Sequence, residues 1–314
     1  PYGAVVAWDG EHCAQICCKK SSCGFSVYDE IQALCYLKKA SAAAYGYVSA
    51  QNHTIFQLTR LPGPSVENSQ VCIPNKRGIA YDLKRSEVAA LAGPVSFFYN
   101  WSPTQSARGM KFYPMIWAEK DLARPPLQKT DILLGFNEPN FGDQSALTPS
   151  RAAALWPNVV RIAKSIGARI GSPAVNYCGT NCIEKDPIVW LDTFFAECKR
   201  LTGAACKVDY VAFHSYVCEV QYLNQQAHRY LKYGKPLMLT EFSCLDVPGQ
   251  NASQQARYMK AAVTYLEQNP HVTHYAWFTG KSVEFPSINL FGERQLTPLG
   301  KLYKVLKSCT TDLM

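Results

Sequence analysis

Short apolar runs alternate with amphipathic stretches through most of the chain. Beyond residue 77, the runs with the length of buried strands are 78–81, 95–99, 112–117, 132–136, 169–173, 208–213, 236–240 and 274–278. Helical periodicity predicts helices between several of them, for example over 150–166 and 253–268. Such an alternation over roughly 230 residues is typical of a (β/α)8 barrel, so we predict an α/β fold of this kind.

The first 62 residues follow another pattern and are predicted to form a separate α+β module. Its expected elements are strands over 2–8, 23–28, 33–37 and 54–58 and a short helix over 11–20. A module of this size has a small core and depends on disulfides. Residues 63–75, which begin with Gly, Pro and Ser, are predicted to link it to the barrel domain over 76–314.

Two glutamates stand where buried strands are expected to end. Glu138 follows the fourth apolar run, and Pro139 after it cannot donate to a sheet, so the strand must stop there. Glu241 follows the seventh run, about three βα units of roughly 30 or more residues further on. A lone glutamate at such a position is more often a cap or an ion-pair partner. Two at this separation, the first preceded by Asn137, favour a catalytic pair.

Polar and aromatic side chains gather at the carboxyl ends of the other predicted strands, where barrel enzymes place their catalytic groups. Those expected to bind a substrate are Tyr99, Asn100, Trp101, Trp117, Asn137, His214, Tyr216 and Trp277. Two carboxylates among aromatic rings suit glycoside hydrolysis, in which one protonates the leaving oxygen and the other attacks. His214 alone is also explained as a hydrogen-bonded core histidine. Trp156 and Trp190 lie in predicted helices and are expected to pack in the core.

Four segments carry a closer resemblance: 98–101 (FYNW), 135–140 (GFNEPN), 211–216 (VAFHSY) and 239–242 (LTEF). They resemble glycoside hydrolase family 128, whose members are retaining β-1,3-glucanases, over about residues 76–308.

This resemblance assigns roles to individual residues. It implies that Glu138 is the acid/base and Glu241 the nucleophile. It also implies that Asn137 holds the sugar 2-hydroxyl and that Tyr216 hydrogen-bonds the nucleophile.

Two functions follow, because some members of that family bind glucan without hydrolysing it. The first is a secreted, endo-acting, retaining β-1,3-glucanase that needs no cofactor and no metal. The second is a β-glucan-binding protein on a barrel scaffold with little turnover. The presence of Asn137, Glu138, Tyr216 and Glu241 favours the enzyme.

The amino-terminal cysteines resemble those of a PAN/apple module. The spacing of Cys13, Cys17, Cys23 and Cys35 carries this resemblance, which implies the bonds Cys13–Cys35 and Cys17–Cys23. Cys18 departs from the pattern and could replace Cys17. An unnamed disulfide-rich α+β unit is the alternative.

The remaining cysteines are assigned from their positions along the chain. Two pairs enclose short loops, one pair follows the ends of neighbouring strands, and one pair brackets the barrel, whose first and last strands are adjacent. The predicted bonds are Cys178–Cys182, Cys198–Cys206, Cys218–Cys244 and Cys72–Cys309.

Composition indicates an oxidising compartment. The 314 residues include 13 cysteines, and sequons begin at Asn52, Asn100 and Asn251, which predicts a secreted glycoprotein. The net charge of +8 comes from scattered Lys and Arg, so nucleic acid is not an expected partner. No apolar run is long enough to cross a membrane. We expect a monomer whose partner is a β-glucan.

Overall fold

The computed structural model describes residues 73–308, the backbone of 4–6, 23–29, 34–39 and 53–57, and Cys13. The chain divides into two compact units, one of residues 1–71 with 219–229 and the other of residues 72–218 with 230–314. The domain boundaries expected at residues 62 and 75 stay a prediction.

The amino-terminal unit contains an antiparallel sheet with the strand order β1-β3-β2-β4. Its strands are β1 Ala4–Val6, β2 Cys23–Asp29, β3 Leu34–Lys39 and β4 His53–Gln57, each of which overlaps a predicted strand. Cys13 is helical, buried and disulfide-bonded. Cys17, Cys18 and the side chains of Cys23 and Cys35 lie outside the described residues. The bonds Cys13–Cys35 and Cys17–Cys23, and the PAN/apple assignment, therefore stay predictions.

The carboxyl-terminal unit is an α/β fold built on parallel strands. Within residues 73–308, one sheet has the order β10-β11-β12-β5-β6-β7 and a second sheet pairs β8 with β9. The strands are β5 Arg77–Ala80, β6 Phe97–Tyr99, β7 Lys111–Phe112, β8 Ile132–Leu133, β9 Arg169–Ile170, β10 Val211–Ser215, β11 Leu237–Phe242 and β12 Val272–Phe278. Each of them overlaps one of the predicted runs.

Isolated bridges continue the strand pairing between these two sheets. Met115 pairs with Leu134 beyond β7 and β8, while Gly171 pairs with Tyr210 between β9 and β10. All of these contacts are parallel. β12 in turn pairs with β5, so the first and last strands of this unit are neighbours.

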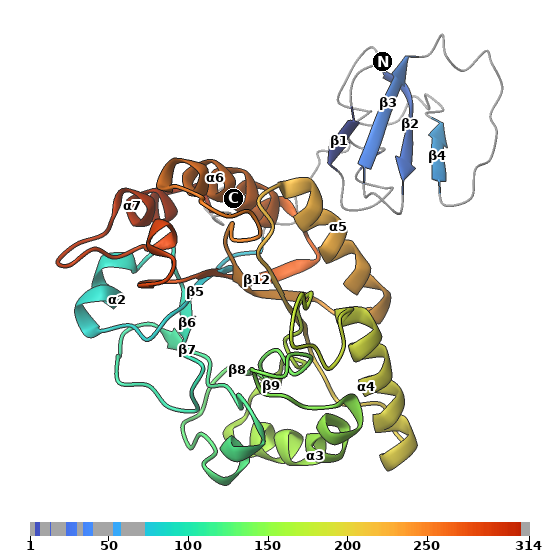
Figure 1. Cartoon of the computed structure of the whole chain (residues 1–314), viewed down its shortest axis with the longest axis vertical. Coiled ribbons are helices and arrows are strands. Elements are labelled where there is room, and N and C mark those ends of the chain that lie inside the picture. Colours follow the sequence, from blue (N-terminus) through green and yellow to red (C-terminus); the bar gives the residue numbers. More distant parts are fainter. Residues whose placement is uncertain are drawn as a thin grey trace, which may run out of the picture. The chain divides into compact units, whose positions relative to one another are not determined.

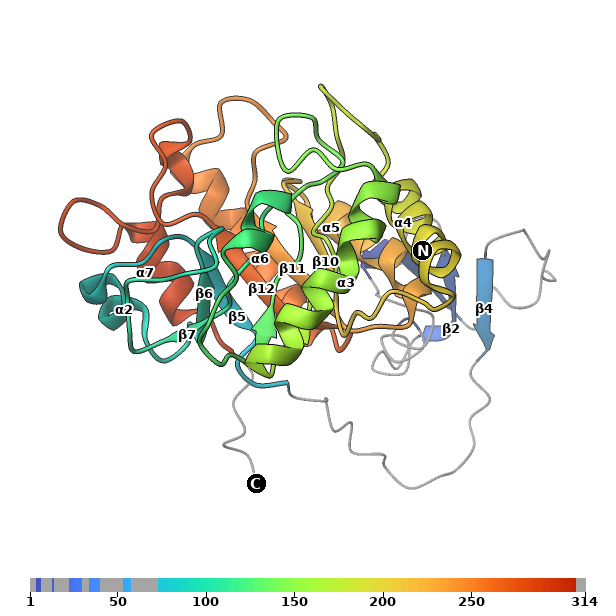
Figure 2. The ribbon, with the colours of Figure 1, turned by 90° about the horizontal axis from the view of Figure 1, so that it is seen from below.

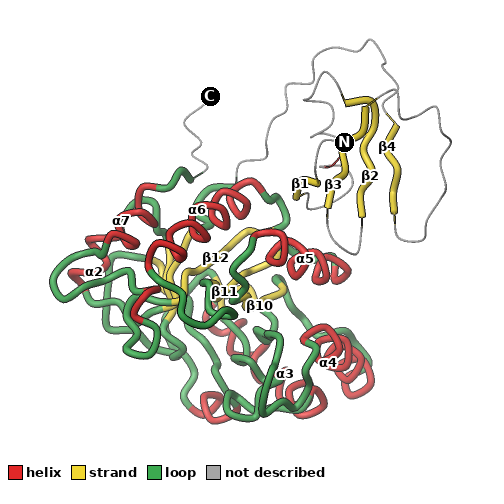
Figure 3. The backbone as a smooth tube through the Cα atoms, turned by 45° about the horizontal axis from the view of Figure 1, so that its top comes forward, coloured by secondary structure: helices red, strands yellow, loops and turns green. Residues whose placement is uncertain are grey.

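Helices surround the strands, as Figures 1 and 3 show for α3, α4, α6 and α7. The helices are α2 Arg85–Leu91, α3 Pro149–Ile166, α4 Pro187–Thr202, α5 Val220–Tyr230, α6 Ala252–Gln268 and α7 Pro298–Val305, with short 3-10 turns η2 Glu119–Ala123, η3 Leu231–Tyr233 and η4 Pro286–Ile288. In the described part of the chain, no helix has both the length and the apolarity that a membrane span requires.

Local sequence explains where α3 begins and ends. The Thr148 side chain accepts a hydrogen bond from the Arg151 N–H, and Pro149 occupies the first turn, where its missing N–H costs nothing. Gly167 ends the helix with φ of 71°, a left-handed conformation that glycine adopts without strain. The helix therefore covers the predicted range 150–166, and Figure 2 shows its course from the side.

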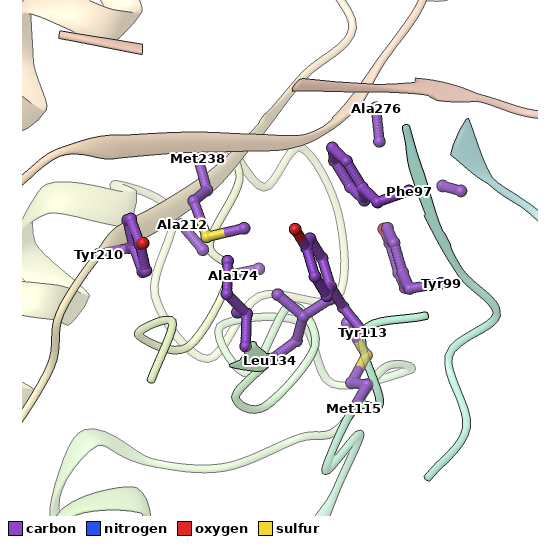
Figure 4. Close-up of a cluster of buried hydrophobic side chains, with 12 residues drawn as sticks. Phe97, Tyr99, Tyr113, Met115, Leu134, Ala174, Tyr210, Ala212, Met238 and Ala276 are labelled. Atoms are coloured by element: carbon purple, nitrogen blue, oxygen red, sulfur yellow. The ribbon is translucent and has the colours of Figure 1, made fainter. Parts of the chain in front are cut away.

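The core of this unit lies between the strands. Figure 4 shows side chains from β6, β10, β11, β12 and the segments after β7, β8 and β9 pointing toward one another, among them Phe97, Tyr113, Met238 and Ala276. Trp156 of α3 and Trp190 of α4 lie outside this cluster and pack against Phe194. Both are at most 2% exposed, and both donate to backbone carbonyls. They have the packing role that the sequence predicts. The packed strands form a rigid base from which the strand ends project.

Candidate active site

A cavity of about 300 Å³ opens at the carboxyl ends of the parallel strands. It is lined by Trp101, Trp117, Asn137, Glu138, Gln144, Tyr216, Glu241 and Phe278. Both predicted catalytic glutamates are among these residues. A larger cavity, of about 770 Å³, lies beside β7 and contains neither glutamate. The predicted catalytic pair therefore belongs to the smaller cavity.

Glu138 is held in place by its backbone and by two side chains. Its φ of 39° is left-handed, which is uncommon for a residue other than glycine. Its N–H donates to Ala174 O at 2.7 Å. Its Oε1 accepts from Asn176 Nδ2 at 3.1 Å and lies 2.9 Å from His214 Nδ1. The carboxyl group thus has a fixed direction at the cavity wall.

Glu241 is a buried carboxylate with several donors. It lies within β11, which continues to Phe242, whereas the sequence suggested that the strand ends one residue before the glutamate. Its Oε1 accepts from Tyr99 Oη at 3.0 Å and from Trp101 Nε1 at 2.8 Å, and its Oε2 accepts from the Tyr216 hydroxyl. Hydrogen bonds of this kind stabilise the ionised form.

Burial raises the pKa of Glu241 above its ordinary value. The charge of His214 opposes this increase, Glu138 adds to it, and the donors Tyr216 and Trp101 lower the pKa again. The phenols of Tyr99 and Tyr216 have pKa values well above the usual range, because they are buried beside Glu241. Both phenols therefore remain protonated and act as donors to the carboxylate.

His214 lies between the two glutamates. Its Nδ1 is 2.9 Å from Glu138 Oε1 and its Nε2 is 3.5 Å from Glu241 Oε1. Burial alone would lower the pKa of the imidazole, but the Glu241 and Glu138 carboxylates raise it above its ordinary value. His214 is 1% exposed and does not line the cavity. The structure thus gives it a bridging position, not the substrate contact expected from the sequence.

Asn137 presents an unpaired acceptor at the cavity. Its Nδ2 donates to Gln144 Oε1 at 3.3 Å, while its buried Oδ1 has no hydrogen-bond partner among the described residues. A buried acceptor left without a partner is costly. A ligand hydroxyl that donates to Oδ1 would remove this cost.

Two of the predicted substrate contacts are elsewhere. Asn100 donates to Asp82 Oδ1 at 2.9 Å and to Thr104 O at 3.0 Å, and it does not line the cavity. Trp277 is fully buried and its Nε1 donates to Ile288 O at 2.9 Å, so it cannot stack on a ligand. Successive strand residues point to opposite faces, and the next residue, Phe278, faces the cavity instead.

The other predicted residues come together around the glutamates. Trp101, Trp117, Asn137 and Tyr216 line the cavity, and Tyr99 lies beneath Glu241 as a donor. Three contributors were missed by the sequence analysis: Gln144, Asn176 and Phe278. Strand alternation would have identified Phe278 as the alternative to Trp277. Asn176 stands beyond the predicted end of the fifth strand, at a position comparable with the other strand ends.

Three of the four disulfides predicted for this unit are present among the described residues. They are Cys178–Cys182, Cys198–Cys206 and Cys218–Cys244, with Cα separations of 5.7, 5.3 and 4.4 Å. Cys72 and Cys309 lie outside the described residues. Asp246 is close to the sulfurs of Cys218 and Cys244, but their bond leaves no thiolate for a metal.

Comparison with known families places these observations in context. A family profile described as "Glycosyl hydrolase catalytic core" matches residues 78–303. A family 128, subgroup II endo-β-1,3-glucanase from Sorangium cellulosum is 34% identical, with 75% of this chain and 100% of that chain covered and a TM-score of 0.68. The corresponding enzyme from Pseudomonas viridiflava is 33% identical, with coverages of 75% and 99% and a TM-score of 0.65.

More distant relatives match a similar share of the chain. A subgroup I endo-β-1,3-glucanase from Amycolatopsis mediterranei, in complex with laminaritriose, is 25% identical, with coverages of 74% and 100% and a TM-score of 0.61. "Alkali-sensitive linkage protein 1" of Schizosaccharomyces pombe is 25% identical over 221 residues. That match covers 66% of this chain and 39% of the yeast protein, so the chain spans well under half of that relative.

Proposed function

The chain belongs to glycoside hydrolase family 128, and from this membership we propose that it cleaves β-1,3-glucan at internal bonds with retention of configuration. The observation that carries the proposal is the meeting of Glu138 and Glu241 at one cavity, joined through His214. Similar enzymes from Sorangium and Pseudomonas are endo-β-1,3-glucanases, which supports the same substrate here.

Glu241 is the proposed nucleophile. Its carboxylate attacks the anomeric carbon, and the bond from that carbon to the leaving oxygen breaks, which forms a covalent glycosyl-enzyme. Hydrogen bonds from Tyr99, Trp101 and Tyr216 support this role, because they hold both carboxylate oxygens in a fixed direction. Preorganised geometry of this kind lowers the cost of reaching the transition state.

Glu138 is the proposed acid/base. In the first step its proton passes to the leaving oxygen, and in the second it removes a proton from the water that releases the sugar. Asn176 and His214 support this role by holding Oε1 on one side of the carboxyl group.

The remaining cavity residues fit a sugar ring. Asn137 Oδ1, which has no hydrogen-bond partner within residues 73–308, is the proposed acceptor for the 2-hydroxyl. Trp101, Trp117 and Phe278 supply apolar aromatic surface for the C–H faces of glucose units. These side chains would hold one sugar between the glutamates.

We also infer that the parallel strands close into a (β/α)8 barrel. The ladder from β10 through β12 and β5 to β7, and the bridges that connect it to β8 and β9, support this inference. The three disulfides support secretion into an oxidising compartment, which is proposed together with the activity.

Hydrolysis of laminarin tests the proposal. The protein is expected to release new reducing ends, and Glu241→Gln is expected to abolish that release while the folded variant still binds glucan. Binding of laminarin by the wild-type protein without any new reducing ends would instead support a non-catalytic glucan-binding protein.

A further inference from the structure

The Cys218–Cys244 disulfide lies between the loops that follow β10 and β11. Cys218 is two residues after Tyr216, and Cys244 is three residues after Glu241. The Cα atoms of the pair are 4.4 Å apart, and Cys244 is 1% exposed. A covalent link therefore connects the segment that carries the Tyr216 phenol to the segment that carries Glu241.

The Cys218–Cys244 disulfide lies just beyond the last paired residues of β10 and β11. The register between β10 and β11 shifts at Phe213 and His214, and the last paired residues are Ser215 and Phe242. Tyr216 is thus the first residue beyond the ladder. Its ring contacts Phe278 of β12, and its backbone is held by contacts between the two loops.

Those contacts converge on the disulfide. The N–H groups of Leu245 and Asp246 donate to Tyr216 O at 2.9 and 3.1 Å. On the other side, the buried Gln255 side chain of α6 accepts from Cys244 N at 3.2 Å and donates to Cys244 O. The backbone of Cys244 is therefore fixed to a helix, and the disulfide transfers this fixed position to the Tyr216 loop.

Tyr216 donates to a different carboxylate oxygen of Glu241 than the other two donors do. Among the described residues, Tyr99 and Trp101 both donate to Oε1, and Tyr216 is the donor to Oε2. A displaced Tyr216 would leave Oε2 without its donor, and the carboxylate would lose the restraint on its rotation.

We propose that the Cys218–Cys244 disulfide is a positioning element, which keeps the Tyr216 hydroxyl on Oε2 of Glu241. Its effect on turnover rests on the function proposed above, whereas its effect on Glu241 itself does not. Because the Tyr216 hydrogen bond lowers the pKa of Glu241, loss of the disulfide should raise that pKa further.

The Cys198–Cys206 disulfide provides a matched control. Cys198 lies near the end of α4 and Cys206 precedes β10, so this bond belongs to a helix-to-strand connection. Such connections lie at the opposite end of parallel strands from the catalytic loops. Its removal should reduce stability without changing the titration of Glu241.

The test is a pH titration of ¹³C-labelled glutamate side chains by NMR in the folded, full-length protein, with the Glu241 signal assigned by its absence in Glu241→Gln. We expect Cys218→Ala/Cys244→Ala to raise the pKa of Glu241, and we expect the same of Tyr216→Phe. Cys198→Ala/Cys206→Ala should leave this pKa at the wild-type value. On laminarin, the kcat of Cys218→Ala/Cys244→Ala should fall roughly tenfold or more with little change in KM, because one charge-assisted hydrogen bond is lost.

A wild-type Glu241 titration in a folded Cys218→Ala/Cys244→Ala protein would overturn the proposal. If that double variant does not fold, the single variant Cys218→Ala, which keeps the buried Cys244 side chain, is judged by the same titration. A raised pKa in a protein that never hydrolyses laminarin would support the positioning role and reject the proposed function.

Discussion

The environment of His214 makes stability depend on pH. Its pKa is raised in the folded state by the Glu241 and Glu138 carboxylates, which outweigh the effect of burial. Between its unfolded value of about 6.5 and the higher folded value, the native state binds more protons than the unfolded state. The stabilisation that protonated His214 contributes is therefore complete below about pH 6.5, and it is lost as the pH rises through the pKa of His214 in the folded state.

We predict that the His214 contribution to the free energy of unfolding falls as the pH rises above about 6.5, and that His214→Gln removes this contribution. Urea unfolding followed by fluorescence at several pH values measures it. His271→Gln is the control, because His271 directly precedes β12, at the amino end of that strand, whereas His214 lies near the carboxyl end of β10. Equal slopes in the wild type and His214→Gln would contradict the assigned linkage.

Trp101 and Trp277 should respond to substitution in different ways. Trp101 lines the cavity and donates to Glu241, so Trp101→Ala should lower kcat/KM on laminarin by more than roughly tenfold. Trp277 is fully buried, so Trp277→Ala should act through folding and cost about 3–5 kcal/mol of stability. Kinetics and urea unfolding of both variants test this. A stable Trp277→Ala protein with a selective kinetic defect would contradict it.

The same pair shows how far single residues can be predicted. The sequence indicates that an aromatic residue of the last strand faces the site, but Trp277 and Phe278 are adjacent and both apolar. Which of the two faces the site depends on which alternate residues of the strand point inward, and the residue types do not reveal this. Glu138, Glu241 and Asn137 were easier to predict, because each stands one or two residues after an apolar run. The role of Tyr216 was predicted from the family resemblance.

At the scale of elements, apolar periodicity predicted all the parallel strands and the helices α3 and α6. It did not predict strand ends. β7 and β8 are only two residues long, and the pairing beyond them is reduced to the isolated bridge Met115–Leu134, while β11 continues through Thr240 and Glu241. Polar residues inside β11 are stabilised by hydrogen bonds to distant residues such as Tyr99, which a local pattern cannot show.

A buried lysine fixes the end of α6 to the beginning of β5. Lys76 Nζ donates to Leu266 O, Glu267 O and Asn269 O at 3.0, 3.2 and 2.7 Å. Burial lowers the pKa of Lys76 to about 8, although Glu267 opposes the change. Between about pH 8 and 10.5 the unfolded chain binds more protons, so this group makes stability rise with pH.

We predict that Lys76→Met costs about 1–3 kcal/mol at neutral pH, because buried carbonyls lose their donor. In the wild type, Lys76 makes the free energy of unfolding rise between about pH 8 and 10.5. The Lys76→Met variant should lack this rise. Urea unfolding of both proteins across this interval measures the effect. Identical pH profiles would show that Lys76 does not titrate as described.

At the scale of the whole molecule, every residue that lines the cavity lies beyond residue 100. A truncated chain that starts at Val71 is therefore expected to hydrolyse soluble laminari-oligosaccharides at close to the rate of the full chain. Reducing-end assays of the two proteins, with circular dichroism as the control for folding, make the comparison. A folded but inactive truncated protein would mean that the amino-terminal module contributes to the site.

The parallel α/β unit after residue 76 was predictable, because apolar runs of strand length alternate there with helical stretches. The pairing across β12 and β5 follows from the expected barrel order. What the sequence could not provide is the bridging of both glutamates by His214, since Glu138 is 76 positions away from His214 along the chain.

The anomeric configuration of the first product is the most direct test of Glu138 and Glu241 as a retaining pair. In ¹H NMR spectra recorded during early hydrolysis of a β-1,3-glucan, before mutarotation, the account predicts the β-anomer at the new reducing end. The Glu241→Gln variant should yield no product under the same conditions. An α-anomer as the first product would mean inversion and would contradict the assignment of Glu241 as the nucleophile.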